Sequence, residues 1–393
     1  MHILEQYALS SGLKIGKPFI YEVFFPIEPE KYITLQKEVK FPSRQYKYWQ
    51  QVVDLVNPIL FKNNVKIVQI GSKNDEALKG VVYTSGETSI AQVHYLIRNS
   101  QMHVGIDSFA VHIASSLGKK IVALYSNMTP ENSGPYWSNP LDCILIQSPR
   151  GDRKPSYAVD ETPRTINEIK PEIIANSILQ LLGIEERVKI ETLFIGEDFS
   201  DSISFGFLPN QVVLSSKFTP DIRMDLFFDE KNLADQLSKQ KSTITTKKEI
   251  SYELLSKFKA NIAKIVYIIE ENDNPDFVKF LFENGFSFSC VSRLNPEKLN
   301  LKKINYYRFS NINEYLETEK EKEFKTLYAK LNASDIFFKS NYIISSDKNS
   351  YLSEQHMLEN EPVKDSKFSS FERVKNSDIF LSEIKNFWII EKT

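Results

Sequence analysis

An acid, a hydroxyl and a histidine lie within six residues of one another in the first half of the chain. They are Asp107, Ser108 and His112, in the stretch MHVGIDSFAVHIASSLGKKIVALYS, residues 102–126. An apolar run precedes Asp107, and a small-residue helix pattern follows Ser108, so the stretch predicts a strand, a turn and a helix. Strand ends and helix N-termini bind anionic ligands in parallel sheets. We expect such a site here; the alternative is that Asp107 and Ser108 only cap a helix and His112 is buried.

The whole chain has the composition of a globular protein. It has 393 residues, of which 41% are hydrophobic and 25% charged, and a formal net charge of −2. This length predicts two domains, and the charge argues against bulk binding to phosphate backbones but leaves room for a local basic patch. Cys143 and Cys290 form no CxxC unit, so neither a disulfide framework nor a zinc knuckle is expected.

The N-terminal residues MHILEQYALSSGLKIGKP are polar where a signal peptide would need an apolar core. No apolar run is long enough to cross a membrane. We therefore expect a soluble, cytoplasmic protein without a membrane span. A high content of Lys, Asn and Ile is typical of an AT-rich genome and favours a phage or bacterial origin.

Strand patterns alternate with helix patterns through the first half, which predicts a parallel, doubly wound α/β sheet. Thr88 or Ser89 is the expected N-cap of one helix, and Gly118 the expected C-cap of another. A long surface loop is expected at 149–170. The predicted strands are 31–36, 65–72, 102–107, 119–126 and 143–148, and the predicted helices are 46–63, 89–100, 109–118 and 171–184.

A second α/β series begins near residue 191. We therefore predict a first domain over 1–190, a second α/β domain over 191–310, and a helical or irregular C-terminal extension over 311–393. The extension should contain an amphipathic helix at 313–332. In the second domain, strands are expected at 191–197, 211–216, 222–229, 264–270 and 286–294, and helices at 230–240, 251–262 and 274–285.

Several blocks of the first half resemble a known family in their order and spacing. They are FPSRQYKYWQQVVDLV, IVQIGSKNDE, the run from YTSGETS to KKIVALYS, and SGPYW. Together they resemble the C-terminal, nucleotide-sugar-binding domain of glycosyltransferase family 9, the ADP-heptose:lipopolysaccharide heptosyltransferases. The resemblance covers residues 2–185 and implies a GT-B fold of two Rossmann-like domains.

The resemblance implies donor-binding roles for the opening stretch. Asp107 would hold sugar hydroxyls, Ser108 and the Phe109 N–H would hold phosphate, and His112 would steady the site. Phe109 stands where the family usually has Gly, so its ring could narrow the sugar pocket. Arg44 matches the family's cation for the donor diphosphate, with Lys40 and Lys47 as alternatives in register; a solvated surface cation is the simpler interpretation.

The nucleoside end of the donor would meet three further residues. Asp75 stands where the family has a Glu that grips the ribose, but Asp is shorter. Gly71 would let the backbone turn close to the nucleotide. Thr88 matches a position beside the base. The alternatives are a loop residue at Asp75 and a helix cap at Thr88. Residues 127–137 could close over the donor or form a plain loop.

Family members carry an acceptor domain, with a catalytic aspartate, before the donor domain. Here the acceptor half is either missing or follows the donor domain. The second α/β series favours the latter, a GT-B enzyme with its halves in swapped order, as in a circular permutation. An inverting transfer needs a general base. We favour Asp198, with Asp201 as the alternative and Asp225 and Asp229 as further candidates; all four could be ordinary loop acids.

The function predicted in this way is a metal-independent, inverting glycosyltransferase. It would use a nucleotide-diphosphate sugar as co-substrate, with no cofactor or bound metal, and a glycan, lipid-linked sugar or modified nucleobase as acceptor. One alternative is a phage-type enzyme acting on modified DNA bases; another is a non-catalytic sugar-nucleotide or glycan-binding module. The sequence contains neither a GxGxxG motif after a first strand nor a P-loop motif, which argues against a dehydrogenase and a P-loop kinase. Lysines that could guide DNA, or simply form a solvated face, are Lys239, Lys241, Lys247, Lys248, Lys257, Lys259 and Lys264.

Overall fold

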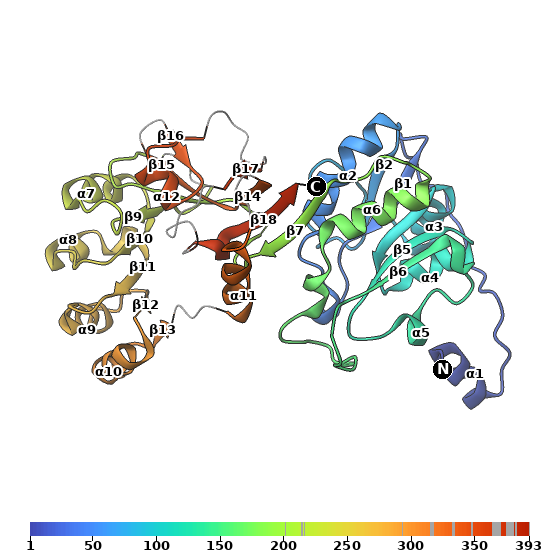
Figure 1. The fold of residues 1–393 in the computed structure, drawn as a ribbon, viewed down its shortest axis with the longest axis horizontal. Coiled ribbons are helices and arrows are strands. Elements are labelled where there is room, and N and C mark those ends of the chain that lie inside the picture. The colour runs from blue at the N-terminus through green and yellow to red at the C-terminus, as the bar shows by residue number, and fades with distance from the viewer. Residues whose placement is uncertain are drawn as a thin grey trace. The chain divides into compact units, whose positions relative to one another are not determined.

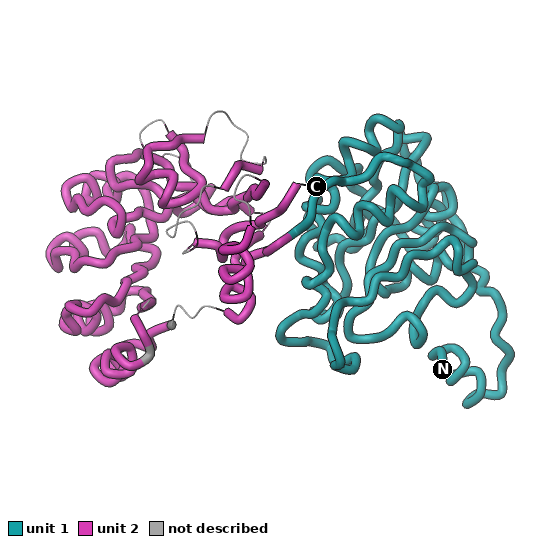
Figure 2. Tube along the Cα trace, viewed as in Figure 1, with its two compact units in different colours: residues 1–192, 393 teal, residues 193–392 magenta. Residues whose placement is uncertain are grey.

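The computed structural model consists of two compact units, residues 1–192 and residues 193–392 (Figure 2). Each unit has its own sheets and hydrophobic core, so each is described by itself. The structure describes residues 1–200, 202–213, 215, 217–292, 294–314, 318–331, 335–346, 349–363, 371–374, 381 and 383–392.

A six-stranded, wholly parallel sheet forms the centre of unit 1. Its order is β3-β2-β1-β4-β5-β6, so the order reverses between β1 and β4. This confirms the doubly wound α/β fold predicted for the first half. The strands are β1 (Tyr32–Gln36), β2 (Lys66–Ile70), β3 (Val82–Tyr83), β4 (Met102–Ile106), β5 (Lys120–Tyr125) and β6 (Cys143–Gln147).

Helices cover both faces of this sheet (Figure 1). Two of them, α3 and α4, share one apolar core with the strands, in which Val93 and Ala110 lie with Val68 and Tyr125. The others, α2 and α6, contact each other on the opposite face. The helices are α1 (Ile3–Ser11), α2 (Trp49–Lys62), α3 (Ile90–Asn99), α4 (Phe109–Ser116), α5 (Pro130–Ser133) and α6 (Pro171–Leu182), with 3₁₀ turns η1 (Pro42–Arg44), η2 (Pro140–Asp142) and η3 (Thr165–Glu168).

Local signals in the sequence set the ends of these helices. Ser89 is the N-cap of α3: its hydroxyl accepts a hydrogen bond from the Gln92 N–H at 3.3 Å, and the Gln92 side chain accepts one from the Ser89 N–H at 3.0 Å. Gly118 follows α4 with φ of 65°, a conformation that glycine adopts without strain. Ser89, one of the two expected N-caps, is confirmed, whereas the C-cap of α4 is Leu117, one residue before the expected Gly118.

An eight-stranded sheet forms most of unit 2. Its order is β13-β12-β11-β10-β9-β8-β15-β16, and its pairs are parallel except for β15 with β16. From β8 to β13 each strand lies beside the one before it, and right-handed crossovers then place the connecting helices on one face. Figure 1 shows α7, α8, α9 and α10 on that face. The strands are β8 (Ser204–Phe207), β9 (Asp221–Arg223), β10 (Ser242–Thr246), β11 (Ile262–Ile269), β12 (Phe288–Ser292), β13 (Ile312–Glu314), β15 (Tyr342–Ser346) and β16 (Asn349–Tyr351), and the helices are α7 (Glu230–Lys239), α8 (Tyr252–Lys257), α9 (Pro275–Glu283) and α10 (Pro296–Tyr306).

A smaller sheet of four strands, in the order β17-β14-β18-β7, completes unit 2. Its apolar residues, among them Phe194, Phe338 and Phe387, pack with Phe324 of α11 in a separate core. The elements are β7 (Ile190–Ile195), β14 (Ile336–Ser340), β17 (Glu372–Arg373), β18 (Phe387–Lys392), α11 (Glu319–Tyr328) and α12 (Glu354–Leu358), with 3₁₀ turns η4 (Lys259–Asn261) and η6 (Ile384–Asn386).

The C-terminal region corrects the expectation of a helical or irregular extension over 311–393. Its strands are built into both sheets of unit 2: β15 pairs with β8 through Tyr342 and Ser204, and β14 pairs with β18. β15 lies far from β8 in the sequence, so no local pattern predicts that the two strands pair. The stretch 211–216, expected as a strand, is not one in its described residues. In the described part of the chain, no helix is both long and apolar enough to cross a membrane.

Burial predicts unequal effects of the same substitution at two leucines of unit 1. Leu35 is fully buried on β1, whereas Leu141 is 86% exposed in η2. We expect Leu35→Ala to lower the free energy of unfolding by about 2–5 kcal/mol, because it leaves a cavity. Leu141→Ala should change it by about 0.5 kcal/mol or less. Urea unfolding followed by circular dichroism measures both; equal losses would contradict the placement of β1.

Candidate functional site

A pocket of about 780 Å³ lies in unit 1 where the strand order reverses. Its walls come from residues within four segments: 36–45 after β1, 71–75 after β2, 88–93 at the start of α3, and 107–109 between β4 and α4. All four segments lie at or beyond the carboxyl ends of parallel strands, or at the start of the helix that follows. Open α/β sheets bind their ligands in this position.

The structure brings seven of the eight predicted donor-binding residues together around this pocket. The eighth, His112, lies beside it, with Nε2 3.9 Å from Asp107 Oδ1. Lys40, the first alternative to Arg44, also lines the pocket and is exposed, whereas Lys47 does not line it. The seven residues are Arg44, Gly71, Asp75, Thr88, Asp107, Ser108 and Phe109.

Asp107 is buried at the centre of a polar network. Its Oδ2 accepts a hydrogen bond from the Ser133 hydroxyl at 2.8 Å and forms an ion pair with Arg44 Nη1 at 3.2 Å. Arg44 also donates to the Asp107 carbonyl oxygen and to Asn127 Oδ1, both at 2.9 Å. Because Asp107 offsets the charge of Arg44, Lys40 is the cation of the pocket that is more available to an anion.

The start of α4 lacks a side-chain cap. Ser108 is its N-cap residue, but the Ser108 hydroxyl donates to Gln36 Oε1 at 2.5 Å and does not accept from the helix. Ser108 thus occupies the N-cap position, but its side chain does not cap the helix. The uncapped N–H groups and the helix dipole can bind an anion in the pocket. Phe109, which is 45% exposed, lines the pocket next to them.

The loop after β2 holds its acid through local contacts. Asp75 accepts from the Ser72 N–H at 3.1 Å and from the Ser72 hydroxyl at 2.6 Å, and is buried. A Cβ atom on Gly71 would lie 1.8 Å from Asp75 Oδ2, so the close approach requires glycine. A grip on ribose hydroxyls would use the remaining lone pairs of the carboxylate. Thr88 is not the N-cap of α3, and its buried hydroxyl has no hydrogen-bond partner among the described residues.

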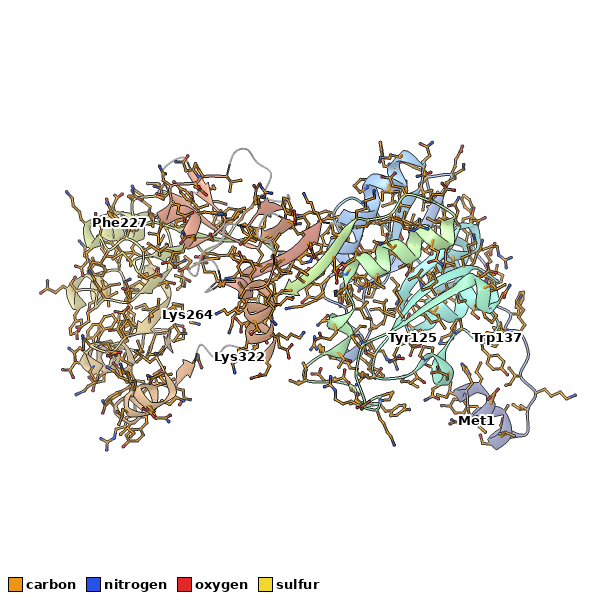
Figure 3. The ribbon with its side chains drawn as sticks, in the orientation of Figure 1. Met1, Tyr125, Trp137, Phe227, Lys264 and Lys322 are labelled. Carbon is orange, nitrogen blue, oxygen red and sulfur yellow. The ribbon has the colours of Figure 1, made fainter. Side chains whose placement is uncertain are left out.

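Residues 149–170 have a role that the sequence did not reveal. The Val159 carbonyl accepts from the Ser43 N–H at 3.1 Å, and the Ala158 carbonyl accepts from the Ser43 hydroxyl and from Asn127 Nδ2, each at 2.8 Å. This segment therefore supports η1, which carries Arg44. The other predicted rim, 127–137, packs partly against the N-terminal residues: the rings of His2 and Tyr136 lie 4.8 Å apart, and Figure 3 shows Trp137 on the same side of unit 1 as Met1.

His103 is a buried residue to which sequence reasoning gave no role. It lies on β4, and its Nδ1 is 3.0 Å from the Thr34 hydroxyl of β1. Its Nε2 has no hydrogen-bond partner in the described part of the chain, and burial lowers the pKa of this imidazole to about 3. Burial also lowers the pKa of His112, although the Asp107 carboxylate acts in the opposite direction.

The candidate bases of unit 2 lie in different places. Asp198 is exposed, and its carbonyl accepts from Asn341 Nδ2 at 2.7 Å at the amino ends of β8 and β15. It follows β7, which belongs to the four-stranded sheet, so it does not lie at the carboxyl edge of the larger sheet. Asp229 caps α7 by accepting from the Asn232 N–H at 3.0 Å. Asp225 lines a pocket of unit 2, and Asp201 lies outside the described residues.

Comparison with protein families identifies the segment that carries the unit 1 pocket. Residues 30–156 match glycosyltransferase family 9 (heptosyltransferase). The match includes β1 to β6 and every residue that lines the pocket. It confirms the family resemblance over this segment, which is shorter than the predicted 2–185.

Comparison with whole proteins adds similar solved structures. E. coli ADP-heptose lps heptosyltransferase II is 18% identical over 45% of this chain and 50% of its own, with a TM-score of 0.32. A family 9 glycosyltransferase from Veillonella parvula gives the same identity, coverage and TM-score. E. coli heptosyltransferase WaaC with ADP is 13% identical over 45% of this chain and 54% of its own, with a TM-score of 0.32. The chain thus spans about half the length of these structures. Curated protein sequences gave no significant match.

The close approach of Gly71 to Asp75 predicts that Gly71→Ala removes the Asp75 carboxylate from its position. We expect a loss of about 1–3 kcal/mol in the free energy of unfolding, because the added methyl overpacks the loop. Gly16→Ala is the matched control, since a Cβ there has no neighbour within 4 Å. Thermal unfolding of both variants measures the effect; if Gly71→Ala is as stable as the control, the loop geometry is incorrect.

Burial of His103 predicts a stability that depends on pH. The folded pKa of about 3 lies below the ordinary value of 6.5, so the unfolded chain binds a proton first and stability falls as pH drops through 6.5. Between about pH 7 and about pH 5 the wild type should lose about 2 kcal/mol more than His103→Asn. Urea unfolding at both pH values tests this, and equal pH dependence in the two proteins would argue against a neutral buried imidazole.

Proposed function

We propose that this protein is a glycosyltransferase that binds a nucleotide-diphosphate sugar in the unit 1 pocket and transfers the sugar to a hydroxyl acceptor. One observation carries the proposal. The pocket at the strand-order reversal is lined by seven residues that the family resemblance assigns to the donor, beside an uncapped helix N-terminus. The match of residues 30–156 to family 9 supports it. We also propose a cytoplasmic site of action, where nucleotide-activated sugars are available.

The pocket suggests how the donor lies. We place the diphosphate against the N-terminus of α4 and within reach of Lys40, because both supply positive potential. The nucleoside then lies toward Gly71 and the hydroxyl of Thr88, which has no hydrogen-bond partner among the residues that the structure describes. The sugar lies toward Asp107 and Phe109, whose ring restricts the space that a glycine would leave open.

The transfer that we propose is inverting and needs no metal ion. The hydroxyl oxygen of the acceptor attacks the anomeric carbon, and a carboxylate of unit 2 accepts the proton of that hydroxyl. The bond between the anomeric carbon and the phosphate oxygen breaks. The electron pair leaves with the nucleoside diphosphate, whose charge Lys40 and α4 stabilise. We propose Asp225 as the base in place of Asp198, because it lines a pocket of unit 2.

We further propose that unit 2 supplies the acceptor side, so that the two halves follow each other in the order opposite to that of the family. A glycan or lipid-linked sugar suits this unit better than DNA. The lysines that could have formed a DNA-binding patch belong to several elements, and some have partners of their own: Lys239 pairs with Asp235 at 2.6 Å, and Lys259 donates to the Asn284 carbonyl at 2.5 Å.

Thermal shifts with ADP-, UDP-, GDP- and CMP-sugars test the donor site. A ligand that binds only the folded state raises the melting temperature, and saturation at about 100 times Kd adds about 2.7 kcal/mol. We expect one nucleotide class to stabilise the wild type and Lys40→Ala to weaken that binding about tenfold, through loss of a charged contact. Lys47→Ala is the control, since Lys47 does not line the pocket.

Two outcomes would change the proposal. If no nucleotide sugar raises the melting temperature, the pocket is not a donor site. If one binds but neither hydrolysis nor transfer of its sugar is detected with glycan acceptors, the protein is the non-catalytic sugar-nucleotide-binding module that the sequence left open.

A further inference from the structure

A second pocket, of about 720 Å³, lies within unit 2. It is formed at the carboxyl ends of β9, β10, β11 and β12 and over the adjoining face of the sheet. This is the face without the helices α7 to α10. Along β11 alternate residues point to opposite faces, so Ile265 and Tyr267 enter the core under the helices while Val266 and Ile268 line the pocket. Figure 3 shows Lys264, from the same row, on the side of β11 away from the helices.

A fixed carboxylate forms one wall of this pocket. Arg223 donates to Asp225 Oδ1 at 2.7 Å and to Oδ2 at 2.6 Å, and the two side chains are 12% and 7% exposed. Arg223 Nη1 also donates to the Tyr342 hydroxyl at 2.9 Å, so the guanidinium cannot turn away. Each oxygen of Asp225 keeps a further lone pair for another donor. The pair therefore presents a rigid hydrogen-bond acceptor to the pocket.

A second, half-buried acid belongs to the same network. Asp221 accepts from the Thr245 hydroxyl at 2.8 Å, and its Oδ2 lies 3.5 Å from the Tyr342 hydroxyl. Burial raises the pKa of Asp221 above its usual value. A Cβ on Gly206 would lie 2.1 Å from the Tyr342 hydroxyl, so a glycine makes room for the network. This half-buried network holds Asp225 and Arg223 in one arrangement.

The charges around the pocket are largely balanced among its described residues. Asp225 is paired with Arg223, and Glu271 is paired with Lys298. Glu270 and Glu354 also line the pocket, together with Lys247. This balance favours a neutral ligand over a polyanion. Carboxylates do accept hydrogen bonds from hydroxyl groups.

The floor of the pocket is apolar and comes from neighbouring strands. Val266 and Ile268 of β11 lie beside Val291 of β12, and Leu294 follows them at the edge. A sugar ring has this same division, with C–H groups on its faces and hydroxyls around its rim. Asn272 and Ser292 add polar groups at the rim of the pocket. The volume of about 720 Å³ lies in the range of small-molecule sites.

We propose that this unit 2 pocket binds a neutral sugar, the acceptor of the transfer, with its hydroxyls on Asp225 and its ring over the floor formed by Val266, Ile268 and Val291. The role of this sugar as the acceptor rests on the proposed function. Binding of the sugar itself does not require a working donor site, so the two can fail separately.

Saturation-transfer NMR on the full-length protein tests the proposal. The probes are methyl glycosides of glucose, galactose, mannose and N-acetylglucosamine, and lactose and cellobiose, with spermidine and a DNA duplex as competitors. We expect at least one neutral sugar to bind at millimolar concentration. Asp225→Asn should weaken that binding about tenfold or more. Asp235→Asn on α7, an exposed acid outside the pocket, should leave it unchanged.

A second variant keeps the test decisive if Asp225→Asn fails to fold. Val266→Trp fills the floor of the pocket without changing a charge and should abolish sugar binding, while the melting-temperature shift with a nucleotide sugar persists. Three results would overturn the inference: no sugar binds the wild type, Val266→Trp binds as well as the wild type, or only spermidine or DNA binds. Sugar binding without any nucleotide-sugar shift would retain this site and remove the proposed transferase.

Discussion

The parallel pairing of β1 with β2 on one side and β4 on the other is the constraint on which unit 1 depends. Because the chain winds outward from β1 in one direction and then in the other, its helices leave the sheet on opposite faces. The carboxyl edge between β1 and β4 is then covered by neither layer. The side chains of Gln36, the last residue of β1, and Ser108, which follows β4, meet there in a hydrogen bond.

Within that edge, the buried ion pair of Arg44 and Asp107 organises the rest. Burying two charges is costly unless each has further partners, and both have them: Ser133 for the acid, Asn127 for the guanidinium. The pair connects η1 to the turn after β4. The carbonyl group of Val159, in the segment 149–170, accepts a hydrogen bond from η1. Because Asp107 offsets the charge of Arg44, the positive potential in the pocket comes from the N-terminus of α4 and from Lys40.

Unit 2 reaches a pocket by a different route. Its strands from β8 to β13 wind in a single direction, which places α7 to α10 on one face of the sheet and the pocket on the other. The pocket face carries half-buried residues such as Val266, and a rigid Arg223–Asp225 pair stands at its edge. The unit 1 pocket is lined by a helix N-terminus and Lys40, and the unit 2 pocket by the paired Asp225 and an apolar floor.

The sequence by itself predicted five of the six strands of unit 1, its helices α2, α3, α4 and α6, and seven of the residues that line its pocket. A strand, a turn and a helix start such as that around Asp107 depend on neighbours along the chain. It also predicted the α/β class of unit 2. Only the tertiary structure decided that Asp107 offsets Arg44, that Asp198 lies near the amino ends of β8 and β15 of the larger sheet, and that the C-terminal region supplies strands to both sheets of unit 2. Such outcomes depend on pairings between distant segments, such as Ser204 with Tyr342, which local periodicity does not record.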